Sequence, residues 1–183
     1  VVTNRDEWIY DLTIQGLEEK IQFTLDEYGK SLNNNGLILD DRFFSTSVIK
    51  WTRLLKNLLR RGVKIKFDST TTRLINFRPF VKRYIYFSPQ LNEFQYQLPS
   101  IFPPKVINRT IAFLSVASDN ELSALSVENA YDLGYLKQGN SGTQCLPRHR
   151  YSPSGECIDN ITDWALRKFQ AGYGKAITKD DIF

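Results

Sequence analysis

The sequence predicts an α+β domain, with a mixed, largely antiparallel sheet and helices on its flanks. Three observations predict this class. Apolar residues recur at helical spacing in two segments of the first third, period-2 alternation and five prolines mark short strands from residue 63 onward, and a further amphipathic helix is expected near the C-terminus. With 183 residues, the chain fits one domain, or at most one domain with an appendage.

Two helices are expected before residue 62. Residues 14, 17, 21, 25 and 28 recur at spacings of three and four, which predicts a helix from near Thr13 to Gly29, followed by a loop over residues 31–36. A second helix is predicted over residues 47–61, ended by Gly62. The residues of its buried stripe are Val48, Trp51, Leu54, Leu55, Leu58 and Leu59.

The remainder of the chain favours strands. Residues 63–67 and 81–87 alternate with period two, and residues 106–116 are typical of a buried strand. Residues 152–155 (Ser-Pro-Ser-Gly) predict a hairpin turn between residues 145–151 and 157–158. A last helix is predicted from near Thr162 to Gly172 or Gly174, and residues 178–181 have the spacing of a capping box that would begin another helix.

Composition narrows the class of protein. The hydrophobic fraction is 42% and the charged fraction 24%, as in soluble globular proteins and unlike disordered ones. The longest apolar run, residues 110–117, is too short to span a bilayer, and early charges argue against a signal peptide. Cys145 and Cys157 are expected to be free thiols of a cytosolic protein. Methionine is absent, which predicts a piece cut at both ends from a longer polypeptide.

Patterns for catalysis and metal binding are weak. The sequence has no glycine-rich phosphate loop, no nucleophile elbow and no metal-binding histidine pair. A metal site would need Cys145, His149 and Cys157, which gives three ligands where structural zinc takes four. His149 stands between two arginines, a poor setting for a general base, so we expect a solvated loop histidine. We predict no catalytic residue, cofactor site or metal site in this chain.

Positive charge is concentrated in one segment. Residues 50–84 hold eleven lysines and arginines against a single acid, Asp68, whereas the whole chain has a net charge of +4. The segment therefore carries +10 and the other 148 residues carry −6. This division predicts one electropositive face on an otherwise acidic molecule, as in proteins that orient on a polyanion.

A nucleic acid is the predicted partner, and a non-catalytic module that binds an acidic protein is the alternative. Basic residues of the second helix and of the segment after it are expected to contact phosphates. These are Lys50, Arg53, Lys56, Arg60, Arg61, Lys64 and Lys66. The candidates for base or groove contact are Arg78, Lys82, Arg83, Asn92, Gln95 and Tyr96. The competing structural roles are an ion pair between Arg78 and Asp68, and core packing for Tyr96.

A set of motifs carries a resemblance to a known family. In chain order they are residues 2–8 (VTNRDEW), 51–56 (WTRLLK), 78–80 (RPF), 84–87 (YIYF), 96–103 (YQLPSIFP), 160–166 (NITDWAL) and 177–183 (ITKDDIF). With these motifs the chain resembles, over nearly its whole length, the C-terminal specificity (target recognition) domain of Type ISP restriction–modification enzymes. Those single polypeptides join a nuclease, a helicase-like translocase, an adenine-N6 methyltransferase and a specificity domain.

The resemblance implies a role within a larger enzyme. The chain would follow the methyltransferase domain, with residues 3–6 at the junction, and would read an asymmetric site in double-stranded DNA. It would help present the target adenine, which must be flipped out of the stack, and license translocation and cleavage by other domains. S-adenosylmethionine, ATP and Mg²⁺ would bind upstream domains, and the enzyme would work in the bacterial cytoplasm without a membrane. Loops near residues 33, 118–120 and 139–142 match no motif, so sequence preference is expected to vary there.

Overall fold

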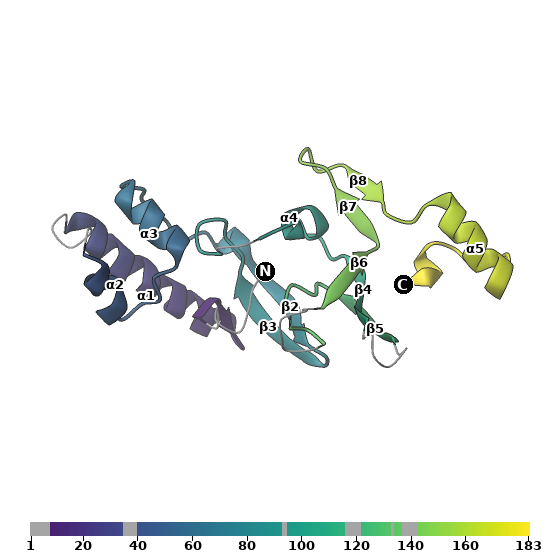
Figure 1. Cartoon of the computed structure of the whole chain (residues 1–183), viewed down its shortest axis with the longest axis horizontal. Coiled ribbons are helices and arrows are strands. Elements are labelled where there is room, and N and C mark those ends of the chain that lie inside the picture. Colours follow the sequence, from purple (N-terminus) through teal and green to yellow (C-terminus); the bar gives the residue numbers. More distant parts are fainter. Residues whose placement is uncertain (1–7, 35–39, 93–94, 116–121, 133, 137–142) are drawn as a thin grey trace. The chain divides into compact units, whose positions relative to one another are not determined.

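The computed structural model describes residues 8–34, 40–92, 95–115, 122–132, 134–136 and 143–183 (Figure 1). Contacts divide the chain into two compact units. Unit 1 comprises Val1–Leu74 and Lys82–Gln95, and unit 2 comprises Ile75–Val81 and Tyr96–Phe183. Helices and small antiparallel sheets make up the fold, which confirms the predicted α+β class.

The described residues of unit 1 form three helices and most of a three-stranded sheet of order β1-β3-β2. Its elements are β1 (Tyr10–Asp11), α1 (Ile14–Asn33), α2 (Asp41–Thr46), α3 (Arg53–Arg60), the 3₁₀ turn η2 (Ser69–Thr71), β2 (Thr72–Arg78) and β3 (Val81–Tyr86). β1 pairs antiparallel with β3, which places Tyr10 opposite Ile85. The boundary between the two units passes through β2 and β3.

The first predicted helix is confirmed at its start and is longer than expected. Thr13 begins α1, because its hydroxyl accepts a hydrogen bond from the Gly16 N–H at 3.0 Å. The predicted end at Gly29 is wrong, since Tyr28 and Ser31 are both buried and the packed face continues past the glycine. A helical glycine costs only about 1 kcal/mol, which this burial offsets. The predicted loop over residues 31–36 is therefore helical up to residue 33, and residues 35 and 36 lie outside the described part.

The second predicted helix is shorter than expected. Helix α3 begins only after Thr52, whose hydroxyl accepts a hydrogen bond from the Leu55 N–H at 3.1 Å, so residues 47–52 are not helical. Within the helix the predicted stripe is confirmed, because Leu55 and Leu59 are buried. Before Thr52 the prediction is wrong for Val48, which is exposed while Ile49 is buried, but Trp51 is half-buried as part of the packed face.

Residues 63–67 keep the predicted alternation without forming a strand. Their odd-numbered side chains are half-buried, whereas Lys64 and Lys66 are exposed. The Tyr28 hydroxyl donates to the Val63 carbonyl at 2.6 Å, which ties this segment to α1. The predicted strand at residues 81–87 is confirmed as β3.

Aromatic rings join the helices of unit 1. The Trp51 ring centroid lies 6.0 Å from Tyr28, 5.9 Å from Phe43 and 5.2 Å from Phe44. Tilted and edge-on aromatic pairs at such distances contribute about 0.5–1.5 kcal/mol beyond their burial. The cluster therefore fixes α2, and the segment that leads into α3, against α1. Figure 1 shows these three helices in purple and blue.

Unit 2 contains a second three-stranded sheet, of order β5-β4-β6, and a separate hairpin of β7 and β8. Its elements are α4 (Leu98–Ile101), β4 (Arg109–Ser115), β5 (Leu122–Glu128), β6 (Gln144–Pro147), β7 (His149–Tyr151), β8 (Cys157–Asp159), α5 (Asp163–Tyr173) and the 3₁₀ turn η3 (Asp180–Ile182). Ala112, Ala130 and Tyr135 form a buried cluster against this sheet. The rings of Phe102 and Tyr131 stack with centroids 4.5 Å apart.

The strand predictions for unit 2 are largely confirmed. The strand expected over residues 106–116 is β4, which begins only at Arg109 because Ile107 is exposed, and residue 116 lies outside the described part. The predicted hairpin is β7–β8, where Tyr151 pairs with Cys157 and Gly155 adopts the left-handed φ of +85° that the turn requires. Residues 145–151 are two strands rather than one, because the ladder breaks at Arg148.

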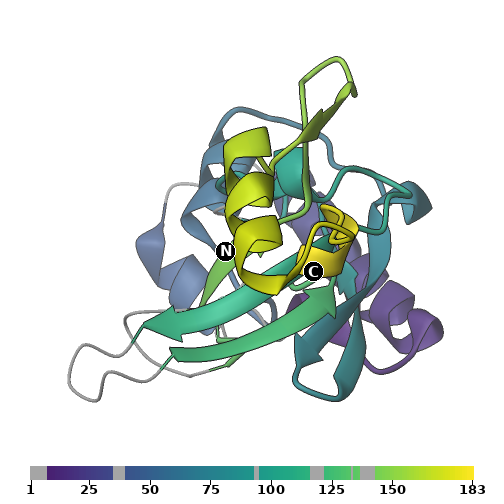
Figure 2. The ribbon, with the colours of Figure 1, turned by 90° about the vertical axis from the view of Figure 1, so that its right-hand side faces the viewer.

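The C-terminal predictions are confirmed for one helix and for the cap that follows it. The Thr162 hydroxyl accepts from the Ala165 N–H at 3.2 Å and begins α5, which ends at Gly174 with φ of +118°. Asp181 accepts from the Thr178 N–H at 2.8 Å, as in the predicted capping box, but the turn it begins is the short η3. This turn lies beside β4 and β5 (Figures 1 and 2), where the Ser126 hydroxyl donates to the Phe183 carbonyl.

No helix in the described part of the chain combines the length and apolarity needed to cross a membrane.

Candidate nucleic-acid interface

The predicted phosphate contacts all fall in unit 1. Helix α3 buries Leu55 and Leu59 and leaves its basic side chains toward solvent. Six of the seven predicted residues are exposed, and Lys56 is half-buried. The structure thus collects in one unit, on α3 and its two flanking segments, Lys50, Arg53, Lys56, Arg60, Arg61, Lys64 and Lys66.

One aromatic ring holds two of these cations. The Lys56 Nζ lies 4.7 Å from the centroid of the Phe44 ring, and the Arg60 Cζ lies 5.7 Å from it. The two residues are four apart on α3, so they occupy the same helix face. Cation–π contacts of this kind contribute about 0.5–1 kcal/mol at exposed sites. The ring therefore restrains both side chains without neutralising either charge.

Acids neutralise little of this surface. Arg60 Nη2 is 3.5 Å from Asp41 Oδ1, and both side chains are exposed enough that the pair contributes at most about 1 kcal/mol. Within the described residues, Arg53, Arg61 and Lys64 form no ion pair, and neither does Lys66. These four cations are consequently available to a negatively charged ligand.

Arg78, a predicted base contact, is held inside unit 2. Its Nη1 lies 2.8 Å from Asp132 Oδ1 and donates to the Phe77 carbonyl at 2.6 Å, and its guanidinium lies 3.9 Å from the Phe77 ring centroid. The expected ion pair between Arg78 and Asp68 is wrong, because Arg78 pairs with Asp132 instead. The Asp68 carboxylate accepts hydrogen bonds from the amide and hydroxyl of Thr70. These bonds hold the pKa of Asp68 below its usual value. Base contact by Arg78 stays a prediction, and it would compete with Asp132.

The predicted base contacts that lie in unit 1 differ in how exposed their side chains are. Lys82 is exposed, and Arg83 and Gln95 are half-buried. Asn92 is buried, and its Oδ1 accepts a hydrogen bond from the Ser88 N–H at 2.6 Å. Contact between Asn92 and a base stays a prediction that would require this side chain to leave its turn.

Tyr96 belongs to unit 2 and is exposed, with a positive φ of +45°. The core-packing role considered for it is therefore wrong. An exposed tyrosine can stack on a base or donate a hydrogen bond to it, so base contact by Tyr96 stays a prediction.

The residues considered for metal binding or base catalysis do not form a site. His149 lies in β7 rather than in a loop, is half-buried, and is fixed through its backbone: Asn108 Nδ2 donates to its carbonyl at 2.8 Å and its N–H donates to Asn108 Oδ1 at 3.2 Å. Burial raises the pKa of the Cys145 thiol, and Cys157 is exposed. In the part of the chain that the structure describes, no three His, Cys, Asp or Glu residues gather closely enough to hold a metal ion.

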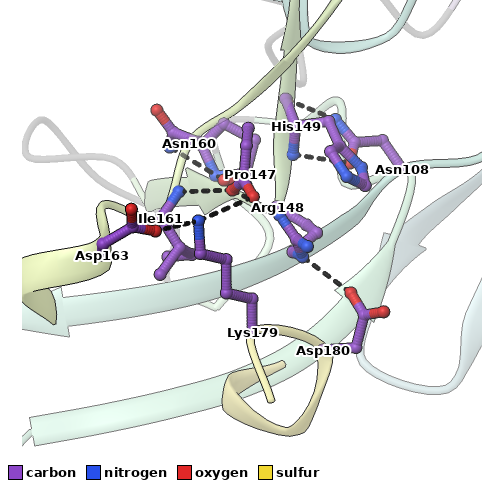
Figure 3. A network of polar contacts seen from close by, with 10 residues as sticks. Asn108, Pro147, Arg148, His149, Asn160, Ile161, Asp163, Lys179 and Asp180 are labelled. Atoms are coloured by element: carbon purple, nitrogen blue, oxygen red, sulfur yellow. Dashed lines mark hydrogen bonds and ion pairs between the residues drawn. The ribbon is translucent and has the colours of Figure 1, made fainter. Parts of the chain in front are cut away.

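A network of ion pairs that the sequence did not reveal holds the C-terminal part of unit 2 together (Figure 3). Arg148 is buried and donates through Nη1 to Asp159 at 2.6 Å and through Nε to Asp180 at 2.7 Å. Lys179 extends the network, with Nζ 3.1 Å from Asp159 and 2.9 Å from Asp163. The network thus joins β8, the first turn of α5 and η3.

Electrostatics keep this network ionised. Burial acts to raise the pKa of Asp159, but the Ile161 amide and Lys179 lower it overall. Burial acts to lower the pKa of Arg148, but Asp180 and Asp159 raise it overall. Hydrogen bonds to Asp163 and Asp159 raise the pKa of Lys179. The groups therefore stay charged around neutral pH, which suits structural ion pairs rather than proton transfer.

These features define a class of protein: an α+β domain that carries an accessible cationic surface on one unit and a structural ion-pair network on the other. Comparison with protein families is more specific. The chain belongs to the family of Type ISP C-terminal specificity domains, whose model matches residues 1–183. The predicted resemblance is thereby confirmed.

Solved structures share the fold. One is a cryoEM structure of a DrdV–DNA complex, 34% identical, with a TM-score of 0.80, covering 100% of this chain and 18% of that chain. A second is the ATP-dependent Type ISP restriction–modification enzyme LlaBIII bound to DNA, 23% identical, with a TM-score of 0.75, covering 97% of this chain and 12% of that chain. A third is a nuclease-deletion mutant of the Type ISP restriction–modification enzyme LlaGI in complex with a DNA substrate mimic, 24% identical, with a TM-score of 0.75 and coverages of 98% and 18%.

The chain spans less than a fifth of the length of each of these structures. No curated protein matches the chain at a significant level.

Proposed function

We propose that this chain recognises a specific site in double-stranded DNA, as the specificity domain of a restriction–modification enzyme. The observation that carries the proposal is the accessible cationic set on α3 and its flanking segments, in a chain of the Type ISP C-terminal specificity family. The solved structures that share its fold are described as bound to DNA or to a DNA mimic, which supports the same partner.

Phosphate contact is the role that suits the α3 residues. Lys56 and Arg60, which both contact the Phe44 ring, present two cations on one helix face. This arrangement suits contact with successive phosphates of one DNA strand. Arg60 would exchange its weak contact with Asp41 for a phosphate oxygen, which is a small cost because that pair is solvent-exposed. Contacts of this kind position a protein on DNA but carry no sequence information.

Base contact is proposed for the exposed residues outside α3, first of all Lys82 and Tyr96. Long donors such as lysine reach acceptors on base edges, and tyrosine can stack or donate. In this role they would select the site that the phosphate contacts hold in place.

Chemistry would then be done by other parts of the polypeptide. We place adenine-N6 methylation, ATP-dependent translocation and endonuclease activity on segments outside this chain, together with S-adenosylmethionine, ATP and Mg²⁺. The specificity domain would position the target adenine for methylation and license translocation and cleavage, in the bacterial cytoplasm.

Salt titration of DNA binding tests the phosphate contacts. The intact polypeptide is titrated with a duplex enriched from a random-sequence pool, and log K is plotted against log[salt]. Arg53→Ala and Lys64→Ala are each expected to reduce the slope by about 0.9, because each lost phosphate contact releases one fewer counterion. Lys30→Ala is the matched control, because Lys30 is an exposed lysine of the same unit whose Nζ already pairs with Glu27 at 2.6 Å.

Two results would contradict the proposal. Slopes for Arg53→Ala and Lys64→Ala equal to that of Lys30→Ala would remove α3 and its flanking segments from the interface. Weak, unselective duplex binding together with tight binding to one acidic protein would instead favour the protein-interaction module.

A further inference from the structure

The turn between β2 and β3 carries an unusual residue. Phe80 is 98% exposed and has a left-handed φ of +66°. Pro79 precedes it, with φ fixed near about −65° by its ring. This combination is that of a type II turn, whose second central position normally holds glycine or asparagine.

Within the described part of the chain, nothing compensates for a phenylalanine here. A residue with a Cβ is strained at this φ, so glycine would be the less costly choice for the turn. The ring, almost fully exposed, gains no burial in return. Residues that combine backbone strain with an exposed apolar side chain are found where the side chain serves a ligand.

The strand that leads into the turn is firmly held within unit 2. The Asn76 N–H donates to the Asn129 carbonyl at 3.1 Å, Phe77 is buried, and Arg78 is fixed by the ion pair with Asp132. Phe80 is therefore presented on an ordered support, which lowers the conformational entropy lost on binding.

Charge near the turn favours DNA over a protein surface as the partner. Residues 69–92 contain four basic residues and no acid, and although Arg78 is paired with Asp132, Lys82 is exposed and follows Phe80 by only two positions. A protruding aromatic ring with cations next to it along the chain suits a ligand with flat apolar faces and a phosphate backbone. Apolar side chains of this kind insert between base pairs as wedges, partly unstacking them and kinking the duplex.

We propose that Phe80 is such a wedge, which inserts between two base pairs of the bound duplex. The inference rests on the proposed function, and it adds the residue that deforms the DNA. Insertion replaces stacking between two bases by stacking on the phenyl ring, and the kink it produces depends on how easily the bound sequence unstacks. Phe80 thereby contributes to site selection without reading a base edge.

The test compares affinity, salt slope and DNA bending in the intact polypeptide. The probe is the duplex enriched by the wild-type protein from a random-sequence pool, with fluorescent dyes on its two ends so that energy transfer reports a kink. Phe80→Ala is expected to weaken binding by about 5- to 150-fold, the range for loss of one aromatic–base stack. It should also abolish the part of the kink due to insertion and leave the salt slope unchanged, because phenylalanine contacts no phosphate.

Three further variants separate this role from a structural one. Phe80→Leu, which keeps an apolar wedge, should retain most of the kink. Phe80→Gly should raise the melting temperature of the protein, because the left-handed strain is relieved, and should still lose affinity. Tyr173→Ala, which removes an exposed aromatic ring of α5 in the same unit, is the matched control and should leave affinity and bending unchanged.

Each contrary result overturns the wedge. Wild-type affinity and bending in Phe80→Ala would exclude insertion, while the α3 variants would still test the proposed function by their slopes. A lower melting temperature in Phe80→Ala and in Phe80→Gly, with DNA binding unchanged, would show that Phe80 packs on another part of the protein. If the wild-type protein enriches no duplex sequence at all, the proposed function fails and the wedge fails with it.

Discussion

Replacing Arg78 by alanine is expected to destabilise unit 2 more than replacing its partner Asp132. The side chains are 2.8 Å apart, and Asp132 is 1% exposed whereas Arg78 is 19% exposed. In Arg78→Ala, the carboxylate loses this cation where water hardly reaches it, although the Gly134 N–H still donates to it at 2.7 Å. In Asp132→Ala, the guanidinium keeps the Phe77 carbonyl and ring and some contact with solvent.

The size of the effect follows from these exposures. Removing one partner of a buried ion pair costs about 3–5 kcal/mol, because a charge is left without compensation. We expect Arg78→Ala near the upper end of this range and Asp132→Ala near the lower end. The double variant should cost no more than about the larger single change, since both single changes lose the same interaction. Acid should relieve Arg78→Ala selectively, because protonation removes the charge of a carboxylate that has lost its guanidinium partner.

Urea unfolding followed by far-ultraviolet circular dichroism measures these differences, at neutral and at mildly acidic pH. Asp68→Ala is the control, because Asp68 is an exposed carboxylate that caps η2 and its loss should cost less than the loss of Asp132. Equal costs for Asp68→Ala and Asp132→Ala would refute the reasoning. So would a double variant whose cost is the sum of the two single ones.

Three further outcomes are expected. Thr52→Ala should cost about 1 kcal/mol in the same urea assay while Thr52→Ser stays close to wild type, since only the hydroxyl that caps α3 is needed; equal losses would contradict the cap. Arg148→Met should lower the free energy of unfolding by about 1–3 kcal/mol, less than Arg78→Ala does. The two partners of Arg148, Asp159 and Asp180, are 39% and 72% exposed, so their carboxylates remain hydrated when the arginine is removed. A larger loss than in Arg78→Ala would contradict this. The pKa values of Asp11, Asp159 and Asp163 are lowered in the folded protein, so the stability they contribute is present above the ordinary value of 3.8 and is lost as the pH falls through their lower folded values. A melting temperature that does not fall on acidification, or a fall that is the same in Lys179→Gln, would contradict this last expectation.

Local chemistry explains which elements could be predicted from the sequence. Helix α5 is confirmed at both ends because its signals are local: a threonine cap at Thr162 and a glycine at position 174. The end of α1 was missed because burial of Ser31, a tertiary effect, outweighs the helix-ending signal of Gly29. The start of α3 was missed because Ser47 and Thr52 both resemble N-caps, and only packing shows that Ile49 and not Val48 is buried.

The candidate site divides in the same way. Exposed cations on α3 follow from helical periodicity, and the exposure of Arg53 and Arg60 agrees with it. The partner of Arg78 lies 54 residues away along the chain, so no local pattern could choose Asp132 over the nearby Asp68. The partners of Arg148 lie 11 and 32 residues away and were missed for the same reason. Phe80 was noted only as part of a motif, because strain and exposure are not visible in a sequence.

Burial separates the basic residues of this chain into two roles that their sequence positions do not distinguish. Arg78 and Arg148 have their charges compensated by aspartates. Because Arg78 is one of the basic residues of 50–84, the +10 charge of that segment overstates what a ligand would meet. The seven predicted phosphate contacts would together give a salt slope of about −6, but such contacts cannot distinguish one sequence from another. In the proposed function, specificity would come from side chains outside that set that are exposed enough to reach bases, such as Lys82, Tyr96 and Phe80. Because a wedge selects deformable steps and edge contacts select individual bases, the two together would define a longer site than either alone.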